Sequence, residues 1–160
     1  MGFNKEQLKS LVESTLKYIS VGKYKFYSDD VVWFLLRIFA QESKFGYYLE
    51  QLGNGPAKGL GQVEPFTQKD NYINWLQYRP EIVEKIAELC GTAEPLPLQL
   101  YNPIRCIIEA RIKLYRSPGA IPPKADILGQ AKYWKKYYNS EQGQGKINEF
   151  IDNAKDFNLT

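Results

Sequence analysis

The sequence contains no histidine among its 160 residues, and this absence excludes whole classes of active site. Ser-His-Asp and Cys-His catalysis, and metal sites with histidine ligands, all require an imidazole. The acid–base candidates that remain are mostly Asp, Glu, Lys, Tyr and Cys. We expect no metal and no organic cofactor.

Cysteine and long apolar runs are also scarce. The two cysteines, Cys90 and Cys106, lie among apolar residues, which is more typical of buried free thiols than of a disulfide or a metal pair. No apolar run is long enough to span a bilayer, and the polar start MGFNKEQLKS is unlike a signal peptide. We therefore expect no stable membrane insertion, and synthesis in a cytoplasm with outside help for any export.

Charge of either sign is not in large excess. The net charge is +3 and the sequence pI is about 8.7, without the dense Lys/Arg face of a nucleic-acid binder. We therefore expect no nucleic-acid partner, although a mild basic bias suits an anionic polymer or a cell surface. With 44% hydrophobic and 24% charged residues, the chain is expected to form one domain over residues 1–160, and a monomer.

Apolar periodicity predicts a mainly α fold. Asn4 is expected to cap a first helix, and Ser28 a second. The body of the second helix, Val31 to Ala40, is apolar on nearly all sides and should be the buried central helix. Further helices are predicted from Pro65 to about Lys69, after Pro80, after Asn102-Pro103, from about Ala125 to Tyr138, and after Gly145.

A glycine-spaced segment follows the apolar helix. Gly53, Gly55, Pro56, Gly59 and Gly61 are incompatible with a regular helix. We expect a loop, or a short irregular β-hairpin, that lines a cleft.

Glu42 stands where the apolar helix ends and this segment begins. Poor solvation disfavours the charged carboxylate and raises its pKa, and the negative end of the helix dipole acts in the same direction. A carboxyl that keeps its proton near neutral pH can protonate a glycosidic oxygen as a general acid. The alternative is a glutamate at the solvent end of a helix, paired with Arg37 or Lys44.

Four segments share their order with one known superfamily. They read ESKF at 42–45, GLGQVEPFT at 59–67, YNPIRCIIEARIKLYR at 101–116 and WKKYYNSEQGQGKI at 134–147. They resemble the Glu-Ser-x-Phe element, the Gly-Leu-Met-Gln-x-x-Pro-x-Thr element, the helix that follows, and the Ala-Tyr-Asn-x-Gly-x-Gly element of the lytic transglycosylase and goose-type lysozyme superfamily. The resemblance runs from about Val31 to Phe150. It implies a lysozyme-like fold whose central helix ends at the catalytic glutamate, with peptidoglycan glycan strands in the cleft.

The resemblance also implies a reaction. Glu42 would act as acid and then as base in cleaving the β-1,4 bond between N-acetylmuramic acid and N-acetylglucosamine. In lytic transglycosylases the sugar's own 6-hydroxyl attacks, which gives a 1,6-anhydro product. Goose-type lysozymes carry an aspartate at the position of Glu64, where a second carboxylate can position a water for inverting hydrolysis at a separation of roughly 6.5–9.5 Å. Alternatively, Glu64 caps the helix at Pro65 or faces solvent.

Substrate contacts follow from the same resemblance. Gln62 matches a glutamine that contacts substrate, and Tyr138 and Asn139 match a Tyr-Asn pair whose tyrosine orients the acid, with Tyr137 as the alternative. The family often places a serine before the glycine motif; here Asn54 takes its place, or the contact is lost.

Six further positions have open alternatives. Ser43 bonds Glu42 or substrate, or else the backbone at the helix end. Gly59 lets the backbone approach a sugar or a helix. Flat rings suit sugar faces as well as ordinary packing, and the candidates are Tyr47, Tyr48, Tyr101 and Trp134.

The sequence leaves three hypotheses for function. The first is a bacteriolytic glycosidase of a bacteriophage, either an endolysin released by a holin or a virion-associated lysin with virion proteins as partners. The second is a non-catalytic wall-binding or virion structural protein that keeps the fold. The third is a helical protein-interaction domain in which the motifs are coincidental.

Overall fold

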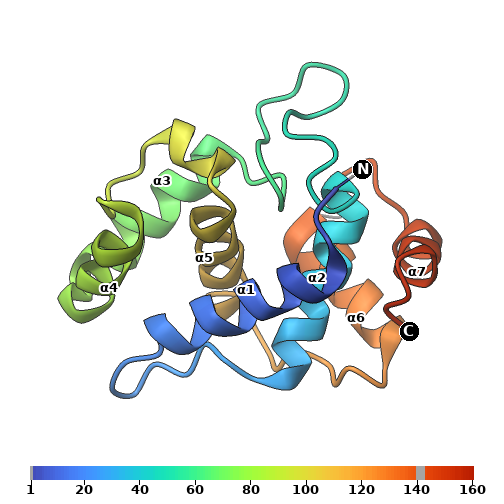
Figure 1. The fold of residues 1–160 in the computed structure, drawn as a ribbon, viewed down its shortest axis with the longest axis horizontal. Helices are drawn as coiled ribbons and strands as arrows, with labels where there is room; N and C mark the ends of the chain where they lie inside the picture. Colours follow the sequence, from blue (N-terminus) through green and yellow to red (C-terminus); the bar gives the residue numbers. More distant parts are fainter. Residues whose placement is uncertain (1, 140–142) are drawn as a thin grey trace.

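The computed structural model describes residues 2–139 and 143–160, and within these ranges the fold is all-α, with seven α-helices and no strand (Figure 1). The mainly α prediction is confirmed. None of the helices in these ranges combines the length and the apolar character needed to cross a membrane. The helices are α1 Lys5–Ile19, α2 Asp29–Ser43, α3 Pro65–Asn74, α4 Pro80–Cys90, α5 Pro103–Tyr115, α6 Ile127–Tyr133 and α7 Ile147–Asp156.

The helices begin at the residues whose side chains favour a helix start. The Asn4 side chain accepts the N–H of Gln7, and the Ser28 hydroxyl accepts the N–H of Val31. Pro80 is the first residue of α4, where its missing N–H costs nothing. These starts confirm the predictions made from local sequence.

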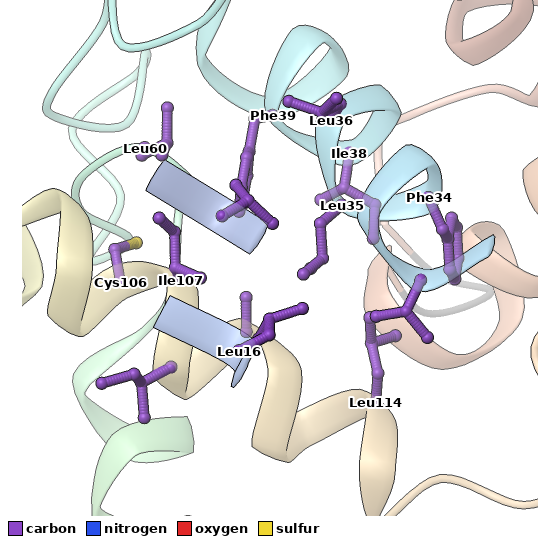
Figure 2. Close-up of a cluster of buried hydrophobic side chains, with 14 of the residues drawn as sticks. Leu16, Phe34, Leu35, Leu36, Ile38, Phe39, Leu60, Cys106, Ile107 and Leu114 are labelled. Atoms are coloured by element: carbon purple, nitrogen blue, oxygen red, sulfur yellow. The ribbon is translucent and has the colours of Figure 1, made fainter. Parts of the chain in front are cut away.

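Helix α2 is the centre of the core. It packs against α1, α5 and α7, and ten of its fifteen residues are buried. In Figure 2, Leu35 and Phe39 of α2 lie in the same apolar cluster as Leu16 of α1 and Ile107 of α5. The prediction of a central buried helix is confirmed.

The remaining helices form two groups on either side of α2. Helices α3 and α4 pack on α5, and α6 packs with α7 on the opposite side (Figure 1). The chain that follows α2 forms the long loop at the top of this view, between the two groups. The C-terminal end of α2 therefore meets segments from both groups.

This loop is irregular. Two isolated antiparallel bridges, Glu50 with Lys58 and Lys58 with Val63, are its only β-type pairing within the described residues. Of the two alternatives predicted for it, the loop is the one observed.

Two predicted helices differ from the structure in extent. The helix from Pro65 continues past Lys69 to Asn74. The helix predicted over about Ala125–Tyr138 begins at Ile127 and is α-helical only to Tyr133; a π-helix, η3 Trp134–Asn139, follows. A π-helix bonds each N–H to the carbonyl five residues earlier, which local periodicity does not reveal. The wider turn brings both Trp134 and Tyr138 into the interior.

Both cysteines are free thiols, as predicted. Cys106 is buried, and its sulfur accepts the N–H of Gly61 at 3.1 Å. Cys90 is only half-buried, so the expectation of full burial holds for Cys106 alone.

Candidate active site

A pocket of about 770 Å³ lies at the C-terminal end of α2, and we call it the α2 pocket. Its wall combines the end of α2, the loop after it, the start of α3, the end of α5, η3 and residues 143–149. Five of its residues carry the chemistry discussed below: Glu42, Gln62, Glu64, Lys113 and Tyr138.

Glu42 is partly exposed at this pocket, in the last turn of α2. Burial raises the pKa of its carboxyl from the ordinary 4.5 to about 7, against the opposing effects of the Trp134 N–H and the Lys113 charge. The indole Nε1 of Trp134 donates to Oε1 of Glu42 at 2.7 Å. This carboxyl is therefore a general-acid candidate that is half protonated near neutral pH.

The alternative ion pairs of Glu42 do not form within the described residues. Arg37 donates to the carbonyls of Leu159 and Lys124 and to the side chain of Gln130. Lys44 donates to the side chain of Asn153. Arg37 and Lys44 thus bind segments near the C-terminus and residue 124. Among the described residues, Glu42 has no bonded cation.

Ser43 hydrogen-bonds the end of α2 to the glycine-spaced loop that follows it, which we call the glycine loop. It is fully buried, its hydroxyl lies 2.6 Å from the carbonyl oxygen of Leu60, and it accepts the N–H of Gly46 at 2.7 Å. The structure therefore gives Ser43 the backbone-bonding role that was the alternative to substrate contact. This bond sets the position of the loop relative to Glu42.

The two central glycines of the loop permit close approach to helical segments. Gly59 has φ of +76°, and a Cβ on it would lie 1.9 Å from the carbonyl oxygen of Leu100. A Cβ on Gly61 would lie 2.8 Å from the Tyr138 hydroxyl. Of the two alternatives for Gly59, contact with a helix is the one that the structure shows.

Tyr138 supports the loop directly. Its hydroxyl donates to the carbonyl of Gly61 at 2.5 Å, and burial raises its pKa well above the usual value. The predicted role for this hydroxyl was to orient the acid; in the structure the Trp134 N–H does so instead. Tyr137, the alternative to Tyr138, packs on Tyr133 with ring centroids 4.7 Å apart and is not among the described residues of the wall.

The polar side chains predicted to contact substrate divide into two sets. Gln62 and Asn139 line the α2 pocket. Gln62 has a left-handed backbone with φ of +48°, and its Nε2 donates to the carbonyl of Gly59 at 2.9 Å. Asn54, exposed in the loop, and Tyr101 are not among the described residues that line the pocket.

Tyr101 and Trp134, two of the rings predicted to suit sugar faces, both have partners within the described protein. The Tyr101 hydroxyl donates to Glu50 at 2.9 Å and accepts from Lys58 at 3.3 Å, outside the pocket. Trp134 is 0% exposed, and its ring packs on Phe150 at 5.1 Å between centroids. Its indole edge, rather than its face, reaches the site.

Glu64 lies on the same pocket wall as Glu42 and is exposed. It directly precedes α3, and in the described structure its side chain makes no capping bond to that helix. The alternative in which Glu64 caps α3 is therefore not observed in the described structure. The Glu64 carboxyl is free to face the pocket.

Lys113 of α5 also lines the α2 pocket, and the sequence did not single it out. Its Nζ donates to the carbonyl of Tyr138 at 2.6 Å, and burial lowers its pKa while the charges of Glu42 and Glu64 oppose that shift. A signal was present in the spacing: Cys106, Ala110 and Lys113 fall on one face of α5, and Cys106 contacts the glycine loop.

No protein-family model, curated protein or solved structure matches the chain. What the α2 pocket can do follows from its own side chains. Across residues 2–139 and 143–160, no group of three or more His, Cys, Asp or Glu side chains is arranged to hold a metal ion. The described wall of the pocket instead offers the half-protonated carboxyl of Glu42, the carboxyl groups of Glu64 and Glu149, the ammonium group of Lys113 and neutral amides, which suits proton transfer to an uncharged polar substrate.

The fourth motif segment is described only in part. Residues 140–142 lie outside the described residues, and Gly143 and Gly145 line the α2 pocket. A Cβ on Gly145 would lie 2.5 Å from the Trp134 ring, so a glycine here allows the chain to pass close to the indole that bonds Glu42.

Proposed function

We propose that this protein is a peptidoglycan-cleaving enzyme with a lysozyme-like fold, in which Glu42 is the catalytic acid. The observation that carries the proposal is a carboxyl with a pKa of about 7 on the wall of a pocket of about 770 Å³. That volume falls in the usual range of ligand sites, roughly 300–1,000 Å³. The order of the four sequence segments adds independent support for glycan strands as the substrate.

The first step is proton donation. The Glu42 proton passes to the oxygen that bridges N-acetylmuramic acid to N-acetylglucosamine while the bond from C1 of the muramic acid to that oxygen breaks. Positive charge develops at C1, and Glu42 becomes a carboxylate. The Trp134 N–H at 2.7 Å and the nearby charge of Lys113 stabilise that carboxylate.

The second step decides the product. In a transglycosylase, the 6-hydroxyl of the muramic acid attacks C1 and returns its proton to Glu42, which gives a 1,6-anhydro end. In a muramidase, a water attacks instead, and Glu64 on the same wall is the side chain that would take its proton. We favour Glu42 as the essential group in both versions.

The test is lysis of purified cell walls by wild type and by Glu42→Gln. We expect the variant to lose about 10³-fold in rate, because general acid catalysis contributes roughly 10²–10⁴-fold. Glu64→Gln separates the two versions of the second step: loss of lysis in this variant supports the muramidase, and retained lysis supports the transglycosylase. Mass spectrometry of the products separates anhydro ends from reducing ends, and equal lysis by wild type and Glu42→Gln would overturn the proposal.

The setting that we propose is a bacteriophage, with the protein acting on the wall as an endolysin after holin release or as a virion component. Mass spectrometry of purified virions distinguishes them: presence in the particle supports the virion role, and absence supports the endolysin.

A second candidate, a non-catalytic wall-binding or virion structural protein, has one observation in its favour. Ser43 is buried and Asn54 is not among the described residues that line the α2 pocket, so two of the expected substrate contacts are missing. Wall binding without released muropeptides would favour this candidate over the enzyme.

A further inference from the structure

Arg111 of α5 is a buried cation for which the described residues provide no counter-ion. Its exposed fraction is 6%, and its Nε donates to the carbonyl of Phe26 at 2.8 Å. Nη1 is buried without a hydrogen-bond partner among the described residues. The ion pairs of the described chain leave Arg111 out.

Arg111 lines a second pocket, of about 310 Å³, which we call the Arg111 pocket. This pocket lies at the N-terminal end of α2, and it shares no lining residue with the α2 pocket among the described residues. Asp30 of its wall and Glu42 are about 18 Å apart along α2, at 1.5 Å per residue. The Arg111 pocket is therefore separate from the proposed active site, and the inference below does not rest on the proposed function.

The surroundings of Arg111 compensate its charge only in part. The Phe26 and Tyr115 rings lie 5.9 and 5.4 Å from the guanidinium carbon, which provides cation–π attraction. Burial lowers the pKa of Arg111 to about 10, against the opposing electrostatic effects of Tyr115 and Tyr133. A buried guanidinium with open N–H groups is stabilised most by a bound oxyanion.

The single acid on the wall of the Arg111 pocket, Asp30, is engaged elsewhere. Its Oδ1 accepts the backbone N–H of Lys124 at 2.8 Å, and it lies beyond ion-pair distance of Arg111. The positive end of the α2 dipole lies at the same wall through Ser28 and Val31, and it adds to the attraction for an anion.

We propose that the Arg111 pocket binds a small organic carboxylate, whose oxygens pair with the Arg111 guanidinium and whose apolar part packs on Val31, Leu114 and Ile121. The apolar side chains of the wall favour such a ligand over an inorganic anion, which has no apolar part to bury. Its source is either a free acid or the terminal carboxylate of a peptide, and both present the same group.

The experiment is an NMR titration of the full chain, with amide shifts followed at residues 26–31 and 111–121. The probes are isobutyrate for a free acid, N-acetylalanine for a peptide terminus, and inorganic phosphate, all at matched ionic strength. Saturable shifts at these amides with either carboxylate support the proposal, and the tighter of the two identifies the source. Tighter binding of phosphate, or no saturable shift, overturns it.

Two variants and a control locate the binding. Arg111→Met should weaken carboxylate binding by about tenfold or more, since a charge-assisted pair is lost. Arg116→Met removes the same charge from a residue paired with Asp70 at 2.9 Å, and it should leave binding unchanged. If Arg111→Met does not fold, Ala120→Glu, at an exposed position of the wall, places a carboxylate in the pocket and should abolish probe binding. Retained binding in Ala120→Glu contradicts the proposal.

Discussion

Glu42 at the end of α2 and Glu109 in the middle of α5 are both withdrawn from water, but their neighbours differ in kind. Glu109 is 1% exposed; it accepts Arg105 Nε at 3.0 Å and the Asn71 amide at 3.2 Å. Glu42 accepts one N–H, from Trp134, and faces the α2 pocket. Burial raises the pKa of both carboxyls, and at Glu109 the charge of Arg105 acts against the rise.

The difference separates a structural carboxyl, Glu109, from the carboxyl that we propose as the catalytic acid, Glu42. The other N–H groups of Arg105 donate to the carbonyls of Thr92, Ala93 and Glu94, so the pair ties the segment after α4 to α5. A substrate has no access to Glu109 in this buried pair. Burial alone therefore does not mark a candidate catalytic acid; we take burial, access and the lack of a bonded cation among the described residues together as the criteria.

The largest expected effect on stability tests the Glu109 side of this comparison. Glu109→Gln should lower the free energy of unfolding by about 3–5 kcal/mol, because Arg105 is left as an uncompensated buried charge. Urea denaturation at pH 7 measures the change. Wall lysis per folded molecule should remain at the wild-type rate.

The exposed Glu81→Gln on α4 is the control for that experiment, with an expected change within about 0.5 kcal/mol. A loss for Glu109→Gln as small as that of the control would show that the buried pair contributes nothing to the fold.

The next largest expected effect is a gain in the free energy of unfolding, and it concerns Glu42. Its pKa is raised from 4.5 to about 7, so between these values the folded state holds a proton that the unfolded state has lost. The contribution of Glu42 to the free energy of unfolding is therefore fully present below pH 4.5. This contribution, about 3 kcal/mol in total, is lost as the pH rises to 7. Glu42→Gln cannot ionise, and should be more stable than wild type by up to about 3 kcal/mol at pH 8.

Thermal or urea unfolding of Glu42→Gln at pH 4 and pH 8 measures this gain, which should vanish at pH 4. Glu64→Gln, the same substitution at an exposed position of the same pocket, is the control. A Glu42→Gln variant that is equally stable relative to wild type at both pH values would mean that the Glu42 carboxyl is well hydrated.

The smallest effect probes Trp134, the one donor to Glu42 among residues 2–139 and 143–160. Trp134→Phe removes the N–H that favours the carboxylate, so the pKa of Glu42 should rise further and the alkaline limb of the pH–rate profile should move to higher pH. The free energy of unfolding should fall by about 1–2 kcal/mol with the lost bond.

Trp33→Phe, a tryptophan on α2 away from the pocket wall, is the matched control and should leave the profile in place. An unmoved alkaline limb in Trp134→Phe would show that the Trp134 N–H does not act on the reacting carboxyl.

Parts of the site were predicted through the resemblance of the motif segments, not from local pattern alone. Gln62 and Glu64 lie in the motif segment that returns to the end of α2, and the structure brings both to one wall with Glu42. Ser43 and Tyr138 were harder, because a hydroxyl in either position has several partners within reach, and the fold chose the carbonyls of Leu60 and Gly61.

Local sequence was enough to predict where helices begin, which helix forms the core and that a carboxyl stands at the end of α2. These features were accessible because caps and apolar periodicity act within a few residues. Only the tertiary structure decided which groups surround that carboxyl. Trp134, in the π-helix, hydrogen-bonds the Glu42 carboxyl, and Lys113, on α5, lies close enough to act on it electrostatically. Both interactions join segments that are about 70–90 residues apart in the chain. Such contacts are fixed by packing across the whole core, which no local pattern records.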